Sequence, residues 1–227
     1  MFNIKETPLP DYTKKEEIIN CLTHLAGVPV CIIMLIGYLV LQAGQTTPLL
    51  LFSTFLFMIS SLIVFAGSAI YHGLKPCTAK RIMRVVDHCN IYVMIAGSVS
   101  ALFLTHIYEE RPKYTLIIIA VLWVLSIIGI VLTFADLKKF NIPQIFTYVG
   151  LGLFSGIAMK DIWLQGQDEK NLVMYIAVGG FLMTVGAGLY LAGKKHRYFH
   201  SVFHIFILAG MIIIYIGTYK YYEIIFA

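Results

Sequence analysis

The sequence predicts an all-α membrane protein, a bundle of seven transmembrane helices with a cytoplasmic amino terminus and a carboxyl terminus outside. Three observations predict this class. Of the 227 residues, 59% are hydrophobic and only 13% are charged. The mean hydropathy is +0.82, above what a soluble domain of this length shows. The apolar residues form long runs, separated by short clusters that hold nearly all the charges, as bilayer thickness requires of helices of about 20 residues.

The apolar runs define the elements in order. They predict spans near residues 24–41, 49–72, 86–107, 114–134, 142–162, 171–192 and 199–219. Thr47-Pro48 and Asn141-Ile142-Pro143 are helix-start signals before the second and fifth spans, because the missing proline donor costs nothing in a first turn. We therefore expect a cytoplasmic segment at 1–23, a transmembrane domain at 24–219 and a short external tail at 220–227.

The start of the chain shows no removable signal peptide. Its first 20 residues contain seven charges and no apolar stretch or small-residue cleavage site. We therefore expect the first span itself to direct membrane insertion.

Glycines mark the fifth and sixth spans. They are Gly150, Gly152 and Gly156 in the fifth, and Gly179, Gly180, Gly186 and Gly188 in the sixth. Small residues of this kind let helices approach closely. General glycine enrichment of membrane helices explains them equally well.

The distribution of Lys and Arg predicts the orientation, since basic residues near span ends stay in the cytoplasm. Twelve fall on the side of the amino terminus and five on the other. The twelve are Lys5, Lys14, Lys15, Lys75, Lys80, Arg81, Arg84, Lys138, Lys139, Lys194, Lys195 and Arg197; the five are Arg111, Lys113, Lys160, Lys170 and Lys220. Because the net charge of +5 sits in these clusters at span ends, it indicates topology rather than nucleic-acid binding. The four cysteines contain no C-x-x-C pair and predict neither a zinc ribbon nor a disulfide framework.

Histidines at the ends of spans are the first candidates for function, since an ionisable group there must be solvated, paired or bound to metal. GSAIYHG closes the second span and places Ser68 and His72 four residues apart, on one helix face. FHSVFH opens the seventh span and spaces His200 and His204 in the same way. Two histidines at i and i+4 can hold one ion. The topology brings all of these groups to the cytoplasmic edge of the membrane.

Asp87 and His88 open the third span at that same edge. We assign His72, His200 and His204 as ligands of a zinc ion, because three imidazoles and a water make an open, catalytic type of site. Asp87 is either a fourth ligand or, as we favour, the acceptor of a proton from the bound water. Ser68 either holds that water or a substrate oxygen, or bonds back to its own helix. His88 points about 100° away from Asp87 and should face another helix or a headgroup.

A further polar set, Glu17, Asn20 and His24, recurs at helical spacing before the first span. It either lines the mouth of the site or is a simple helix start, in which Glu17 favours the helix dipole. His106 and His196 we expect to be solvated surface residues.

These motifs, in this order, resemble the hemolysin III family, the bacterial branch of the progestin and adipoQ receptor superfamily, which is also similar to alkaline ceramidases. The resemblance is carried by EEIINCLTH, SAIYH, DHCNIYVMIAGS and FHSVFHIFILAG, between about Glu17 and Gly210. It implies a seven-helix protein of a bacterial plasma (inner) membrane, with zinc on His72, His200 and His204. Val99, Ser100 and Ala101 depart from the family's Tyr-Thr-Pro after IAGS, and Phe203 stands where tryptophan is common. These departures concern the shape of the pocket.

Three functions fit these features. The first is a metal-dependent hydrolase of a lipid amide or ester, with Asp87 and Ser68 as catalytic residues. The second is a lipid sensor or receptor-like protein in which zinc braces the helices. A pore-forming haemolysin is the weakest, because the spans show no repeated polar stripe that would line a channel. Membrane lipids are the expected partners in each case.

Overall fold

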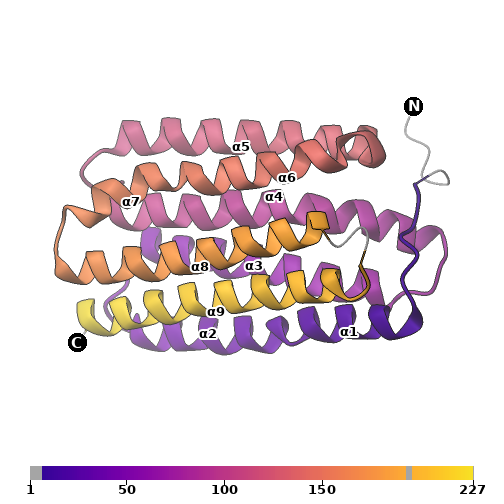
Figure 1. The fold of residues 1–227 in the computed structure, drawn as a ribbon. Helices are drawn as coiled ribbons and strands as arrows, with labels where there is room; N and C mark the ends of the chain where they lie inside the picture. The colour runs from indigo at the N-terminus through magenta and orange to yellow at the C-terminus, as the bar shows by residue number, and fades with distance from the viewer. Residues whose placement is uncertain (1–6, 193–195, 227) are drawn as a thin grey trace.

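The computed structural model describes residues 7–192 and 196–226, and all regular structure in those ranges is helical. Figure 1 shows the helices side by side along one axis, with the start of α1 at one end of the bundle, called here the N-terminal end, and the end of α9 at the other. Seven helical segments are long and apolar enough to cross a membrane. The predicted fold class is therefore confirmed, and the chain is a multi-pass integral membrane protein. Its orientation stays a prediction, and Lys5, Lys194 and Lys195, which contribute to it, lie outside the described residues.

The first span consists of two helices, α1 (Lys14–Leu25) and α2 (Gly27–Leu41). It begins ten residues before the predicted start at residue 24, because a capping box at Thr13 and Glu16 nucleates a helix in the charged segment. Pro29 lies in the first turn of α2 and has no N–H to continue the hydrogen bonds of α1, which matches the break between the two helices.

The second, third and fourth spans are α3 (Pro48–Gly73), α4 (Thr78–His106) and α5 (Pro112–Ala135). The helix-start prediction for α3 is confirmed: Thr47 is the N-cap and accepts a hydrogen bond from the Leu50 amide. The α4 helix starts eight residues earlier than predicted, so it extends well beyond the apolar run. That extension carries Lys80, Arg81 and Arg84 on the helix itself.

The fifth span combines α6 (Leu137–Phe154) and α7 (Gly156–Trp163). Here the predicted helix start at Asn141-Ile142-Pro143 is wrong. Asp136 caps α6 by accepting from the Lys139 amide, and Pro143 lies inside the helix. The acidic cap stabilises the first turn and moves the start six residues upstream of Pro143.

The last two spans are α8 (Gln167–Ala192) and α9 (Phe199–Ile225), which pack along each other for most of their length. A Cβ atom at Gly179 would collide with the Gly210 carbonyl, so these glycines do allow close approach. Gly150, Gly152, Gly180 and Gly188 have nothing within 4 Å of the place where a Cβ would lie. The glycines of these spans thus divide into packed and open positions.

The bundle closes through α9, which contacts α8 on one side and both α1 and α2 on the other. The α3 helix contacts α1, α2 and α4, so the N-terminal end of the bundle gathers the end of α3 and the starts of α1, α4 and α9. On the opposite side, α6 and α8 touch each other only sparsely.

Candidate metal centre

Three histidines from two helices converge at the N-terminal end of the bundle. His72 lies in the last turn of α3, and His200 and His204 lie in the first turns of α9. One ring nitrogen from each falls within 4.8 Å of the others. The Nε2 atoms of His72 and His200 are 3.3 Å apart. Two nitrogens on one tetrahedral zinc ion are separated by about 3.3 Å, given Zn–N bonds near 2.0–2.1 Å.

The outer nitrogens of two of these rings are held by α1. His72 Nδ1 is 2.7 Å from a carboxylate oxygen of Glu17, and His204 Nδ1 is 3.1 Å from the Asn20 carbonyl oxygen. Both partners are acceptors, so each Nδ1 carries the proton and each Nε2 keeps its lone pair free. This tautomer is the one a metal ligand needs.

Unsatisfied polar atoms concentrate in the same place. Among the described residues, eight buried side-chain nitrogen or oxygen atoms have no hydrogen-bond partner. Six of the eight belong to Asn20, His24, Ser68, Tyr71 and His200. Because a buried polar atom without a partner costs about 1–3 kcal/mol, such clustering is typical of a place that binds a polar ligand or an ion. The donor set of three imidazoles fits zinc.

Asp87 and Ser68 stand beside the histidines. Asp87 is close enough to interact with His72, Ser68 and Arg84. The Ser68 hydroxyl nevertheless has no partner at normal hydrogen-bond geometry, so the alternative that it bonds back to its own helix carbonyl is not observed. Both residues line the cavity described below. Asp87 is partly accessible through that cavity, although it lies inside the bundle.

The polar set on α1 contributes to the site and is more than a helix start. Besides the contacts of Glu17 and Asn20, the Asn20 side chain accepts a hydrogen bond of 2.5 Å from Ser201. The His24 ring stacks on His204, with centroids 3.6 Å apart and planes 14° from parallel. The interpretation that this set lines the site is therefore the one that the structure favours.

The segment before α1 covers the histidines from the N-terminal side. Arg81 and Arg84 donate to the backbone carbonyls of Thr7 and Pro8 and hold the segment across the end of the bundle. Tyr12 stacks on His200, with ring centroids 5.2 Å apart. Burial raises the pKa of the Tyr12 phenol above its ordinary value, so the covering ring is neutral.

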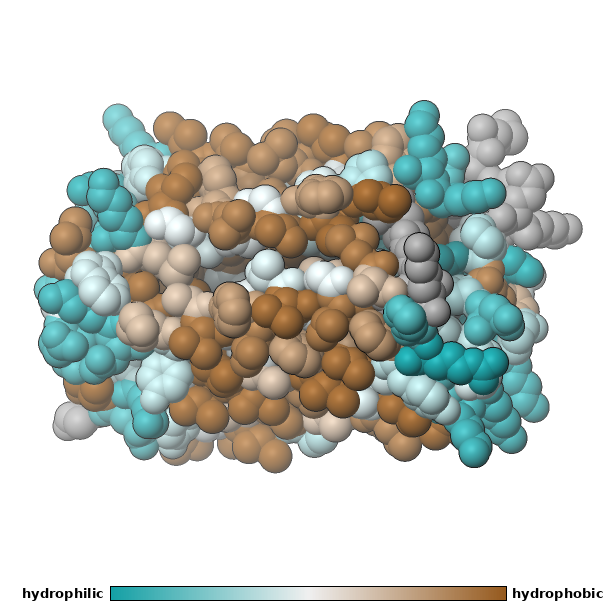
Figure 2. Space-filling model, in the orientation of Figure 1, coloured by the Kyte–Doolittle hydropathy of each residue, from teal (hydrophilic) through white to brown (hydrophobic). Residues whose placement is uncertain are grey.

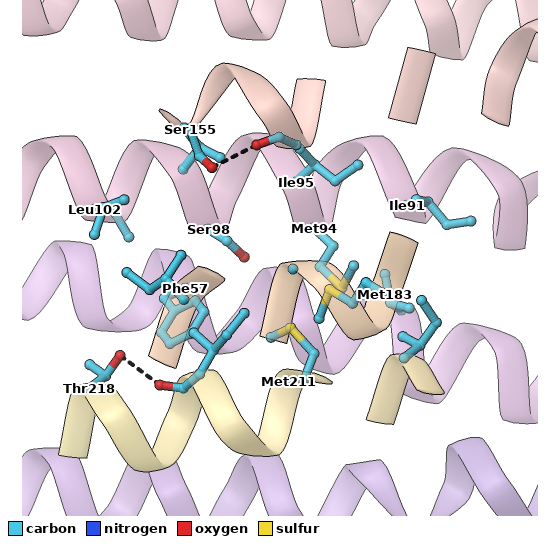
Figure 3. Close-up of a pocket in the computed structure, with 18 of the residues that line it drawn as sticks. Phe57, Ile91, Met94, Ile95, Ser98, Leu102, Ser155, Met183, Met211 and Thr218 are labelled. Carbon is cyan, nitrogen blue, oxygen red and sulfur yellow. Dashed lines mark hydrogen bonds between the residues drawn. The ribbon is translucent and has the colours of Figure 1, made fainter. Parts of the chain in front are cut away.

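A cavity of about 580 Å³ extends from this centre along the inside of the bundle. At one end it is lined by His24, Ser68, Asp87 and His204. Its middle is mostly apolar, and Figure 3 shows Met94, Met183 and Met211 meeting there from α4, α8 and α9. The cavity continues to Thr105, His106 and Tyr222 near the other end of the bundle.

The cavity opens sideways between α6 and α8. Leu153 and Phe181 both line it, yet they are 72% and 67% exposed. Gly152 and Gly180 line the same opening and leave it free of side-chain atoms. Figure 2 shows the corresponding hollow in the apolar face of the molecule. The cavity therefore has an apolar opening on the side of the bundle and a polar end at His24 and His204.

For the remaining histidines, two of the predictions agree with the structure and one does not. His88 faces α6 and lies 3.1 Å from the Gln144 side chain, as predicted. His196 is exposed, as expected. The prediction for His106 is wrong: it is only partly exposed, lines the cavity and packs on Tyr221, because α4 turns this last residue toward the interior of the bundle.

Two site residues are absent from the sequence prediction. Lys80 enters the sequence prediction only as one of the twelve basic residues that indicate the cytoplasmic side. In the structure it is 2% exposed and pairs with Glu17. Tyr12, which lies within the predicted cytoplasmic segment at 1–23, stacks on His200. The position of Lys80 between the motifs of His72 and Asp87 is the one signal that points to its role.

The fold and the site define a class: a seven-helix integral membrane protein with a three-histidine cluster at one end of an apolar cavity. Residues 12–215 match the haemolysin-III related family, and the chain belongs to that family. It is 30% identical over 199 residues to the Hemolysin-3 homolog of Bacillus subtilis (strain 168), covering 88% of this chain and 91% of that protein. It is 25% identical over 198 residues to Hemolysin-3 of Bacillus cereus, covering 86% and 87% of the two chains.

Proposed function

We propose that this chain is a zinc-dependent hydrolase that cleaves an amide or ester bond of a membrane lipid. The observation that carries the proposal is that His204 of the three-histidine cluster, together with Asp87 and Ser68, lines one end of an apolar cavity that opens on the side of the bundle. Such a cavity takes the acyl chain of a lipid and brings its polar linkage to the histidines. We place the protein in the plasma (inner) membrane of a bacterium, with the histidines on the cytoplasmic side.

The side chains have separate tasks in this proposal. His72, His200 and His204 would hold the ion, which supplies Lewis acidity for the carbonyl and a water of lowered pKa. Asp87 accepts the proton of the attacking water and passes it to the leaving amine or alcohol. Ser68 donates its hydroxyl hydrogen to the substrate, because its hydroxyl lies beside Asp87 at the end of the cavity. Water is consumed, the carbonyl–nitrogen or carbonyl–oxygen bond breaks, and a fatty acid and an amine or alcohol leave.

A lipid sensor without turnover is the second candidate. The observation that favours it is the cover over the centre, in which Tyr12 stacks on His200 and the segment is fastened by Arg81 and Arg84. In a sensor of this kind the ion braces α3 against α9, and Asp87 is dispensable.

The Asp87→Asn variant distinguishes the two. For a hydrolase we expect the release of fatty acid from a palmitoyl amide, in detergent micelles, to fall by about 10²–10⁴-fold, because general-base assistance is lost. Zinc content should stay that of the wild type. Asp11→Asn is the matched control, since Asp11 is exposed at the same end of the bundle. Turnover that persists in Asp87→Asn contradicts the assigned role, and a wild type that binds the amide without cleaving it supports the sensor.

A further inference from the structure

One face of α1 lies against the candidate metal centre. Glu17, Asn20 and His24 are spaced three and four residues apart, so their side chains share that face. Two of the three hold the outer nitrogen of a histidine from another helix, His72 of α3 and His204 of α9. The α1 helix therefore lies beside the three clustered histidines, and none of the three belongs to it.

Glu17 is the charged member of this face. Its Oε2 atom accepts a hydrogen bond of 2.7 Å from His72 Nδ1. The His72 side chain is 0% exposed and that of Glu17 is 20% exposed, so water competes little for this contact. A short hydrogen bond from an imidazole to a carboxylate fixes the ring orientation and makes the opposite nitrogen a better metal ligand.

A buried lysine holds Glu17 in turn. Lys80 Nζ lies 2.9 Å from Glu17 Oε1, the oxygen that does not contact His72. The same ammonium group donates to the carbonyls of Tyr71 and Leu74, at 3.1 and 2.9 Å, where α3 ends. Lys80 thus fixes both the carboxylate and the helix end that carries His72. Charge balance is kept, because one buried cation faces one carboxylate.

We propose that Glu17 is a positioning residue of the metal centre, which holds His72 with its Nε2 lone pair toward the ion and is itself held by Lys80. This rests on the proposed function only in requiring that a divalent ion binds the three histidines. The third ligand gives the contrast. Among the described residues His200 Nδ1 has no hydrogen-bond partner, and the aromatic rings of Tyr12 and Tyr190 pack against that imidazole.

The test measures metal affinity on the full chain in detergent micelles. Metal is removed with a chelator, and zinc affinity is then determined by competition with a chelator of known strength. Binding of Co²⁺ is followed in parallel by its visible absorption, which reports ligand geometry and does not respond to fold stability alone. For Glu17→Gln we expect zinc affinity to fall about 10–100-fold, with a changed Co²⁺ spectrum.

Glu16→Gln is the matched control. Glu16 is the neighbouring carboxylate. It caps α1 through Thr13 and accepts from the Tyr198 amide, and none of its hydrogen bonds among the described residues goes to His72, His200 or His204. Its replacement should lower stability while zinc affinity stays within about twofold of the wild type. Glu17→Asp, which keeps the charge opposite Lys80, should lower zinc affinity less than Glu17→Gln; it serves as the test if Glu17→Gln does not fold.

The outcomes separate the inference from the proposed function. A wild type that binds zinc, together with folded Glu17 variants of unchanged affinity and Co²⁺ spectrum, overturns the role of Glu17 and leaves the zinc proposal standing. Equal losses in the Glu16 and Glu17 variants also overturn it, since the effect is then one of helix stability. A wild type that binds neither zinc nor Co²⁺ overturns the metal-dependent function, and the inference with it.

Discussion

Two regions of the cavity, at the histidines and at the opening between α6 and α8, differ in how their walls are held. At the N-terminal end, α1, α3, α4 and α9 hold His72 and His204 through specific hydrogen bonds, and a buried Lys80 fastens the helix end. Between α6 and α8, the walls are exposed apolar side chains and glycines with open space around them. The first region fixes the positions of side-chain atoms, and in the proposed function the second admits a flexible acyl chain. Changes in the first should therefore alter the metal and the chemistry, and changes in the second only access of lipid.

The largest effect is expected from the loss of a histidine at the N-terminal end of the bundle. In His204→Ala one of the three proposed ligands is lost, and we expect zinc affinity to fall on the order of 10²–10³-fold, since a binding free energy of about 10–16 kcal/mol is shared among few ligands. His196→Ala removes an exposed histidine and should have no effect. Chelator competition measures both, and equal affinities in the two variants would remove His204 from the site.

The second effect concerns Lys80, which holds Glu17 and the end of α3 at the N-terminal end of the bundle. Lys80→Met leaves Glu17 without its cation and the α3 carbonyls without their donor, so the free energy of unfolding should drop by about 3 kcal/mol. Unfolding in a mixed-micelle denaturation series gives the value. Lys75→Met, at an exposed position of the loop just before α4, should change it by less than about 0.5 kcal/mol. Similar small changes in both would mean that the buried lysine contributes little.

The smallest effect is expected at the opening of the cavity between α6 and α8. Gly180→Leu places a side chain in the opening between α6 and α8, and uptake of a fluorescent fatty acid should weaken on the order of tenfold with zinc content unchanged. Gly188→Leu is the matched control, because Gly188 has the same open surroundings on the same helix but does not line the cavity. If both variants take up the fatty acid as the wild type does, the lipid route lies elsewhere.

The sequence was sufficient to predict the seven spans and the convergence of His72, His200 and His204. Apolar runs are set by bilayer thickness, and the spacing of His200 and His204 fixes a common face whatever the tertiary packing. The start of α6 was missed because the cap at Asp136 outweighs the proline signal seven residues later. Such local competition between helix signals is decided by small free-energy differences.

The cavity could not be predicted at all. Phe181 and Leu153 line it. In a membrane helix, however, the same apolar residue types face a cavity and face lipid, so the sequence does not distinguish the two surfaces. Lys80 was missed for a related reason, since a lysine near a span end ordinarily reaches the interface and sets topology. Its burial depends on Glu17, a contact between helices that are far apart in the chain.

X-ray absorption at the zinc edge can determine whether three imidazoles hold one zinc ion. For the purified protein loaded with one equivalent of zinc, we predict a shell of nitrogen and oxygen atoms at about 2.0–2.1 Å with the outer-shell scattering of three imidazole rings. A sulfur shell near 2.3 Å, or zinc that is bound without imidazole scattering, would contradict it.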